Sequence, residues 1–436
     1  MNSNREFPHL YRWRYESERS SHIYARICVL TGIHYSISRD SECLSERRIP
    51  MAIKKKNCAS VEMIAYKFYG VPSARDLQLE LQTYGCCRKL WNLMLSDKND
   101  YYRKYKQPLH VTPVAYKADY PFLKEVDSLA LCNVQMHQDS AFSNFFKRNA
   151  RYPVFKSKKN SRKSYTTNAV YSKRKDGSTG CNVILDETRG ILLLPKHQDP
   201  VQLKLHRSIR PNGKLKSVTV SMDPDGKCYY SILMEYPKQV PSVKIEPANS
   251  IGLDMSLPKL YVDSNGDSPD FPKPYRTVES RIAKIQRRMS HKKHGSANYE
   301  KQRQKLAKLY AKSKHQRSDM LHKLSCKLTD QYDVIGIEEL DMSAMKRALR
   351  FGKSISDNGW GMFANMLQYK ADRKGKKLIK IDRWFPSSKT CCACGHVHKE
   401  LTLSDRTYIC PVCGNVMDRD KQAAINIRNE SIRMLG

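Results

Sequence analysis

Long apolar runs are missing from this chain of 436 residues. No stretch reaches the roughly 18 consecutive apolar residues that a membrane-spanning helix needs. The first thirty residues carry scattered arginines without an uninterrupted apolar core, and they do not resemble a signal peptide. Lipid-anchor motifs are missing too, so a membrane surface is a poor candidate for a partner.

Acidic residues are scarce relative to basic ones. The chain has 43 Asp and Glu against 78 Lys and Arg, which gives a formal net charge of +35. Solubility accounts for only part of such an excess, and the basic residues are spread along the chain. The composition therefore indicates a polyanionic partner, for which nucleic acid is the best candidate.

The cysteines lack the distribution of a secreted disulfide framework. Of the 14 cysteines, five fall between residues 391 and 413 and the rest are scattered. Such clustering is typical of a metal site in a reducing compartment.

Two C-x2-C pairs make up most of this cluster. Cys391 and Cys394 form the first pair, Cys410 and Cys413 form the second, and a glycine suited to a tight turn follows each. Four thiolates at this spacing predict a tetrahedral Zn²⁺ site without an open position, and therefore a structural zinc. Two nearby histidines, His396 and His398, could replace a thiolate as zinc ligands, and the fifth cysteine, Cys392, is assigned to packing.

The first half of the chain reads as a β module interrupted by helices. Residues 1–60 show no clear period and are interpreted as a weakly structured extension, with Met51 as a candidate start. A strand over 61–72 is followed by Ser73, which suits the cap of a helical region over 75–150. Residues 216–237 alternate on both sides of a D-P-D-G turn and predict a hairpin.

The last third follows the element order of a ribonuclease H-like α/β fold. Two strands over 250–267 precede a basic helical region over 275–330, which His294-Gly295-Ser296 breaks into two arms. A buried strand over 333–340, a helix that stops at Gly375 and a strand over 377–382 come next. The cysteine cluster is inserted before a final helix that begins near Asp420.

Three carboxylates fall at the ends of these elements. Asp254 lies in the first strand, Glu338 ends the strand at 333–340 with Glu339 as an alternative, and Asp420 starts the last helix. Phosphodiester cleavage by two Mg²⁺ ions needs such a set of hard oxygen ligands. Taken singly, an acid in or after a strand is usually a cap or turn residue.

At these residues the chain resembles the TnpB family, the RNA-guided endonucleases encoded by bacterial insertion sequences and related to type V CRISPR effectors. Residues 354–427 carry the most specific part of the resemblance, which extends over about 61–430. The matching stretches include CCRKLWN, PFLKEVDSLAL, YPVFKSKKN, LYVDSNG, DMLHKLSCKL, GIEEL, DNGWGMFANMLQYKADRKGKKLIKIDRWFPSSKTC and CPVCGNVMDRDKQAAINI.

The resemblance implies a RuvC nuclease domain whose catalytic, magnesium-binding triad is Asp254, Glu338 and Asp420. The chain departs from the family pattern at Gln422, where Asn is usual, and the residues around Asp254 are less rich in glycine. It further implies a wedge β module over 61–74 and 180–247, a helical recognition insert over 75–179, the nuclease domain over 248–385 and 417–436, and the zinc knuckle over 386–416.

The implied partners are a guide RNA derived from the transposon end and double-stranded target DNA with a short flanking motif. The resemblance also implies the bacterial cytoplasm as the location, and two copies of the protein on one RNA as a possible assembly. Base pairing would then read the target sequence, while the protein reads shape and backbone. The candidate nucleic-acid contacts are Lys156, Lys158, Lys159, Arg162, Lys163, Tyr165, Arg287, Arg288, Lys292 and Lys293. The alternative for each of them is a solvated position on the surface.

Two other functions compete with cleavage. One is an RNA-guided DNA binder that has lost nuclease activity and acts as a repressor, but all three acids are present here. The other is a DNA-binding accessory to transposition that uses no guide RNA, which co-purifying RNA would exclude.

Overall fold

The computed structural model describes residues 61–159, 163–173, 177–238, 241, 243–342, 357–402 and 405–436. The predicted extension over 1–60 and the candidate contact Arg162 lie outside these residues. The chain divides into two compact units: one holds Met1–Ser221 and Cys228–Tyr236, and the other Met222–Lys227 and Pro237–Gly436. In the described parts of the chain, no helix is long and apolar enough to cross a membrane.

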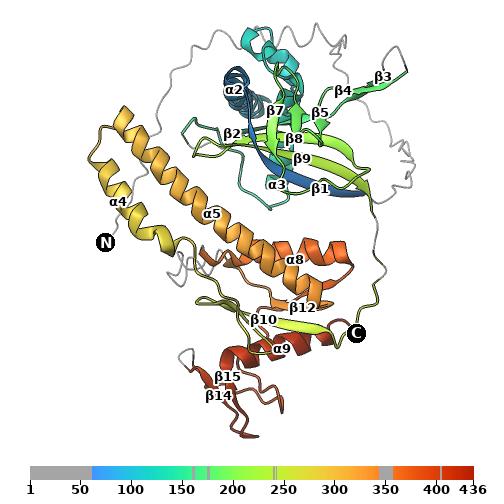
Figure 1. Ribbon diagram of the computed structural model, residues 1–436, viewed down its shortest axis with the longest axis vertical. Coiled ribbons are helices and arrows are strands. Elements are labelled where there is room, and N and C mark those ends of the chain that lie inside the picture. Colours follow the sequence, from blue (N-terminus) through green and yellow to red (C-terminus); the bar gives the residue numbers. More distant parts are fainter. Residues whose placement is uncertain are drawn as a thin grey trace, which may run out of the picture. The chain divides into compact units, whose positions relative to one another are not determined.

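A curled seven-stranded sheet is the centre of the first unit (Figure 1), and its strand order is β2-β8-β9-β1-β7-β6-β5. The predicted hairpin is present as β8 and β9, but the sheet also takes in residues 163–168 as β2, which the sequence placed in the helical insert. The strands are β1 (Val61–Val71), β2 (Lys163–Asn168), β5 (Ile184–Asp186), β6 (Ile191–Leu193), β7 (Val201–Lys204), β8 (Lys214–Met222) and β9 (Cys228–Pro237), with β3 (Tyr171–Lys173) and β4 (Thr179–Cys181) as a separate pair.

Two helices, α2 (Ala74–Tyr105) and α3 (Ser128–Phe146), accompany this sheet, with short 3₁₀ turns at Pro113–Tyr116 and Pro121–Lys124 between them. The predicted cap at Ser73 is confirmed, since its side chain accepts the backbone N–H of Asp76 at 3.2 Å. Asp76 in turn accepts the backbone N–H groups of Gln198 and Asp199, both at 3.1 Å, so the start of α2 is fixed to the chain before β7.

A buried acid joins α2 to the sheet. Glu80 is fully buried, and the hydroxyl of Tyr230 on β9 donates to its carboxylate at 2.6 Å. Burial raises the pKa of Glu80 to about 7, and it lowers the pKa of the neighbouring His197, whose ring nitrogen lies 3.9 Å from the carboxylate. Near pH 7 Glu80 is therefore about half protonated, and the imidazole of His197 is largely neutral.

The second unit contains a four-stranded sheet in the order β11-β10-β12-β13. β10 pairs with β12 and β12 with β13 in parallel, whereas β11 is antiparallel to β10. In this register Gly252 is opposite Gly336 and Leu253 is opposite Ile337. The strands are β10 (Ser250–Ser256), β11 (Leu260–Asp263), β12 (Val334–Glu338) and β13 (Lys377–Ile381).

The apolar side chains of this sheet pack against α5 (Ala297–Gln331) and α8 (Trp360–Lys374). The core contains Leu253 and Ile337 from the sheet, Leu321 from α5, and Phe363 from α8. α8 stops at Gly375, as predicted, because that residue adopts a left-handed conformation with φ of 69°.

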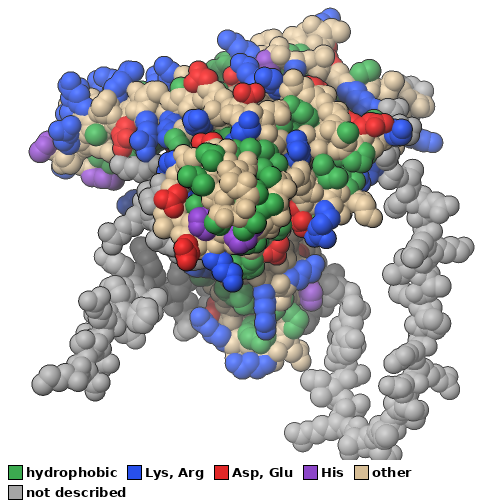
Figure 2. All heavy atoms as spheres, turned by 90° about the horizontal axis from the view of Figure 1, so that it is seen from below, with side chains coloured by type: hydrophobic (Ala, Val, Ile, Leu, Met, Phe, Trp, Pro, Cys, Tyr) green, Lys and Arg blue, Asp and Glu red, His purple; other side chains and the backbone are tan. Residues whose placement is uncertain are grey.

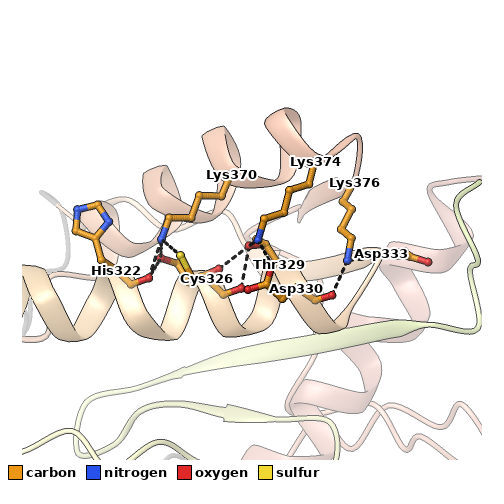
Figure 3. Close-up of polar contacts among 9 residues, drawn as sticks. His322, Cys326, Thr329, Asp330, Asp333, Lys370, Lys374 and Lys376 are labelled. Carbon is orange, nitrogen blue, oxygen red and sulfur yellow. Dashed lines mark hydrogen bonds and ion pairs between the residues drawn. The ribbon is translucent and has the colours of Figure 1, made fainter. Parts of the chain in front are cut away.

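Three lysines at the end of α8 and just after it bind along α5 (Figure 3). Lys370 is 7% exposed and donates to the carbonyl of His322 and the hydroxyl of Ser325, both at 2.7 Å. Lys374 and Lys376 continue the row, with Lys374 2.6 Å from the carboxylate of Asp330. These bonds hold the two helices in one register.

The predicted break in the basic helical region is confirmed. α4 (Glu279–Ser290) ends before residues 294–296 and α5 begins at Ala297, capped by Ser296. Val278 and Ile282 pack against Leu309 of α5, so the two helices form a pair.

The last helix, α9 (Arg419–Arg433), covers the other face of the sheet (Figure 1). A Cβ added to Gly252 would lie 2.1 Å from the carbonyl oxygen of Ala424, and one added to Gly336 would lie 2.2 Å from the hydroxyl of Ser431. The two paired glycines therefore let α9 approach the strands more closely than any side chain would allow.

Candidate metal and nucleic-acid sites

The three predicted acids come from two strands and one helix that pack together. Side chains alternate along a strand, so Asp254 shares the face of Gly252, and Glu338 shares the face of Gly336. That is the face that α9 covers. Glu339, the alternative to Glu338, is exposed.

The packing of α9 places the third acid at the same edge. Asp254 lies two residues, or roughly 7 Å, beyond Gly252 along β10. Asp420 lies four residues, or roughly 6 Å, before Ala424 along α9. Ala424 contacts Gly252, and the charge of Asp420 acts on Asp254, so the two carboxylates lie at the same end of the sheet–helix contact.

The electrostatics of Asp254 agree with this arrangement. Burial raises the pKa of its carboxyl well above the ordinary value, and the nearby charges of Glu338 and Asp420 raise it further. Arg419 opposes the shift and lies 3.7 Å from a carboxylate oxygen of Asp420. Half-buried acids that repel one another favour a bound cation, so the chemistry of these residues suits divalent ions.

Two residues without a predicted role support Glu338. Ser387 donates its hydroxyl to Glu338 at 2.6 Å, and burial raises the pKa of this carboxyl while the Ser387 bond lowers it. Asn426 on α9 donates to the carbonyls of Ser387 at 2.7 Å and Thr390 at 2.6 Å. Ser387 belongs to the quoted FPSSKTC stretch, but its spacing alone gives no reason to place it beside Glu338.

The four cysteines come together as predicted. Their sulfur atoms all lie within 4.8 Å of one another, and in the described chain no other group of three or more His, Cys, Asp or Glu side chains was found to be this close. Cys391 lies 3.6 Å from Cys413, and Cys394 lies 3.6 Å from Cys410. Sulfurs at the corners of a tetrahedron around zinc are separated by about 3.8 Å when each Zn–S bond is about 2.3 Å. The site therefore fits Zn²⁺.

The turns around these sulfurs have the expected form. Gly395 and Gly414 have φ values of 76° and 71°, which favour glycine. The backbone N–H groups of Cys413 and Val412 hold the pKa of Cys410 at about 6, so this thiol ionises readily. His396 and His398 are not part of the sulfur cluster.

The second cysteine pair lies in the loop of a short hairpin, β14 (Thr407–Ile409) and β15 (Val416–Asp418), and β15 leads into α9. Asp418 caps this helix by accepting the backbone N–H of Lys421 at 3.0 Å, whereas Asp420 lies in the first turn. Gln422 is fully buried, and its carbonyl faces Asn415 at 3.4 Å and Cys392 at 3.9 Å. The amide at this position therefore joins the cysteine segment to α9.

The candidate nucleic-acid contacts differ in their accessibility. Tyr165 is only 8% exposed and packs against Tyr84, so the predicted stacking of this ring on a base is not possible in this structure. Lys156 places its ammonium 3.7 Å from the ring centre of Trp91. Lys292 is half-buried. The remaining described candidates lie at exposed positions, namely Lys158, Lys159, Lys163, Arg287, Arg288 and Lys293.

Lys292 also lines a surface cavity of about 250 Å³ together with Lys301, Lys305 and Lys308 of α5. Figure 2 shows Lys and Arg side chains at many places on the described surface, with fewer acidic side chains among them. The charge is therefore distributed, as a long polyanion would require.

Two family models match the second half of the chain. The model of the Cas12f1-like TNB domain matches residues 360–427, which include all four clustered cysteines. The model described as "Probable transposase" (OrfB_IS605) matches residues 231–349.

Curated relatives match most of the chain. A protein of Streptomyces pristinaespiralis named "Putative RNA-guided DNA endonuclease" is 34% identical over 373 residues, which cover 83% of this chain and 87% of the relative. The "Putative RNA-guided DNA endonuclease InsQ" of Escherichia coli K12 is 27% identical and covers 83% of this chain and 91% of that one. A "TnpB-like protein" of Acanthamoeba polyphaga mimivirus is 25% identical over 49% of this chain and 42% of its own length.

A solved structure supports the fold. A protein chain of the "Cryo-EM structure of the Cas12f1-sgRNA-target DNA complex" aligns with this chain with a TM-score of 0.51 and 14% sequence identity. The alignment covers 82% of this chain and 83% of that one. At this identity the likeness concerns the fold alone.

Proposed function

This chain belongs to the TnpB family of transposon-associated proteins, and on that premise we propose that it is an RNA-guided endonuclease that cuts target DNA by hydrolysing a phosphodiester bond. One observation carries the proposal: α9 packs directly on Gly252 and Gly336, so the helix that carries Asp420 meets the strands that carry Asp254 and Glu338. Desolvation, and then the charges of Glu338 and Asp420, raise the pKa of Asp254, which agrees with this packing. The second unit would then be a ribonuclease H-like nuclease domain.

Asp254, Glu338 and Asp420 would hold two Mg²⁺ ions at the exposed edge of the sheet. When bound, such ions activate the attacking water and neutralise the leaving oxygen. Ser387 would orient Glu338, and Arg419 would reduce the repulsion among the acids. The close contact of α9 with Gly252 would fix Asp420 relative to Asp254.

The zinc would be structural. Four sulfurs complete its coordination, so no position is open to a substrate or water. Its contribution would be to fix β15 and Asp418, and thus the start of the helix that carries Asp420.

The proposed partners are a guide RNA and a DNA target. The complex named for the solved relative contains both kinds of nucleic acid, and the net charge of +35 suits them. A short flanking motif and a role for the element's own end in supplying the guide are part of the same proposal.

A matched pair of variants tests the nuclease assignment. The protein is purified with its RNA, the RNA is sequenced, and a duplex that matches the guide is incubated with Mg²⁺. Glu338→Gln is expected to abolish cutting while guide and target binding persist, whereas Glu339→Gln, one residue further and exposed, is expected to cut like the wild type.

The alternatives give different results in the same assay. A repressor would bind the matched duplex without cutting it. An accessory protein without a guide would carry no defined RNA. Wild-type cutting by Glu338→Gln would refute the proposed triad.

A further inference from the structure

Trp384 is unusually exposed for a residue of its type. The side chain is 84% exposed, while Trp91 and Trp360 are 6% and 3% exposed. Among the described residues, no aromatic or cation contact of this indole is found. A large apolar ring left in water is characteristic of a surface that meets a partner.

The loop that carries Trp384 is fixed at both ends. The backbone N–H of Trp384 donates to the carboxylate of Asp382 at 2.7 Å, and that of Phe385 donates to the carbonyl of Asp382 at 3.1 Å. Further along, Asn426 of α9 holds the carbonyls of Ser387 and Thr390. The indole is therefore presented by an ordered turn, which lowers the entropic cost of binding a partner.

This turn lies beside the candidate acids. Ile381, three residues before Trp384, pairs with Glu338 across β12 and β13. Ser387, three residues after it, donates to the carboxylate of Glu338 at 2.6 Å. Three residues span at most about 11 Å, so the backbone of Trp384 lies close to the strand end that carries this acid.

The neighbouring charges select the kind of partner. Lys380 and Arg383 are exposed and lie close to Trp384 along the chain, where they could meet phosphates. A flat, electron-rich ring among cations matches a nucleic-acid strand, in which bases alternate with charged phosphates. Paired bases are already stacked in a duplex, so an open ring is best suited to an unpaired base.

We propose that Trp384 is a stacking platform that holds an unpaired base of the DNA strand next to the scissile phosphate. The inference depends on the proposed nuclease function and adds a positioning residue to it. Stacking tolerates any base, because every base has a π face. Trp384 would thus position the strand without reading its sequence.

The test compares three variants, each prepared with its RNA: Trp384→Ala, Trp384→Phe, and Val114→Ala as a control at another exposed apolar position, in the first unit. Trp384→Ala is expected to reduce the single-turnover cutting rate roughly 10-fold or more, because a base–aromatic stack contributes on that order. Trp384→Phe should retain part of the rate, and Val114→Ala all of it. Guide binding and thermal stability should be unchanged in all three.

A second measurement does not depend on cutting. In the Glu338→Gln background, 2-aminopurine is placed at successive positions of the target and displaced strands. We expect one position whose fluorescence is quenched by the complex with Trp384 and restored with Trp384→Ala.

The outcomes separate the two proposals. If the wild type cuts and Trp384→Ala cuts equally well without any change in fluorescence, the stacking role is wrong and the nuclease stands. If the wild type does not cut, the nuclease proposal fails, and the fluorescence scan alone decides whether Trp384 meets a base. A Trp384→Ala effect confined to self-association would assign the ring to a second copy of the chain instead.

Discussion

At the level of single residues, burial decides protonation in the first unit. The pKa of Glu80 is about 7 against an ordinary 4.5, because the carboxyl is desolvated. The folded state therefore keeps a proton that the unfolded state releases, and stability falls as the pH rises from about 4.5 to about 7. The total loss is on the order of 3 kcal/mol, at about 1.4 kcal/mol for each pKa unit.

Glu80→Gln should remove this dependence. Its unfolding free energy should change less between pH 4 and pH 8 than that of the wild type, and the variant should be the more stable protein at pH 8. Denaturant titrations across this range provide the measurement. The exposed Glu187→Gln serves as the control and should keep the wild-type slope; equal slopes for Glu80→Gln would contradict the burial argument.

The candidate site shows how far single residues could be predicted. The sequence indicated Asp254, Glu338 and Asp420 because each acid ends or starts an element. It could not separate Glu338 from Glu339, since that choice depends on which side of β12 faces α9. Tyr165 was misjudged because a basic loop was expected where β2 joins the sheet and buries the ring.

At the level of elements, α9 depends on two glycines. Gly252→Ala would bring a methyl group against the backbone of Ala424 and Arg428, so the helix would have to move away from β10. Overpacking of this kind costs about 1–3 kcal/mol or more. Because Asp420 moves with the helix, we expect a lower melting temperature and a cutting rate reduced at least 10-fold, even well below that temperature.

Thermal melts and cutting assays on the same preparations check this expectation. Gly361→Ala provides the control, since a Cβ there meets only Met342, at an ordinary 3.8 Å. Wild-type activity in Gly252→Ala would show that the contact does not position Asp420.

The cysteine segment is the second element with a direct test. Cys410→Ser removes one of four sulfur ligands and should reduce zinc content from one ion per chain to a small fraction. Cys392→Ser, outside the cluster, should keep its zinc. Elemental analysis of the purified proteins measures both; a wild type without zinc would refute the site.

The elements themselves were largely predictable where the signal is local. Ser73, Gly375 and the break at 294–296 are caps or stops, and each controls only its own turn of chain. The short strands β5, β6 and β7 gave no such signal, because three or four residues become a strand only when a distant partner pairs with them. The contact of Gly252 with α9 joins residues far apart in sequence, and no local pattern reports it.

At the level of the whole molecule, charge governs affinity. With a net charge of +35, binding to guide RNA should release many counterions and weaken steeply with salt. We expect the dissociation constant for the co-purifying RNA to rise at least 10-fold between about 50 and 200 mM salt. Filter binding at several salt concentrations measures the slope, and a flat response would mean that few phosphates are neutralised.

The position of Asp420 along the chain has a consequence for synthesis on the ribosome. Asp254 and Glu338 emerge early, but the third acid follows the cysteine segment and lies in the last helix, α9. A nascent chain that stalls before residue 420 would already carry the basic helices, yet it could not assemble the proposed catalytic set. Incomplete translation products would therefore lack the proposed cutting activity, a consequence of the order of the elements alone.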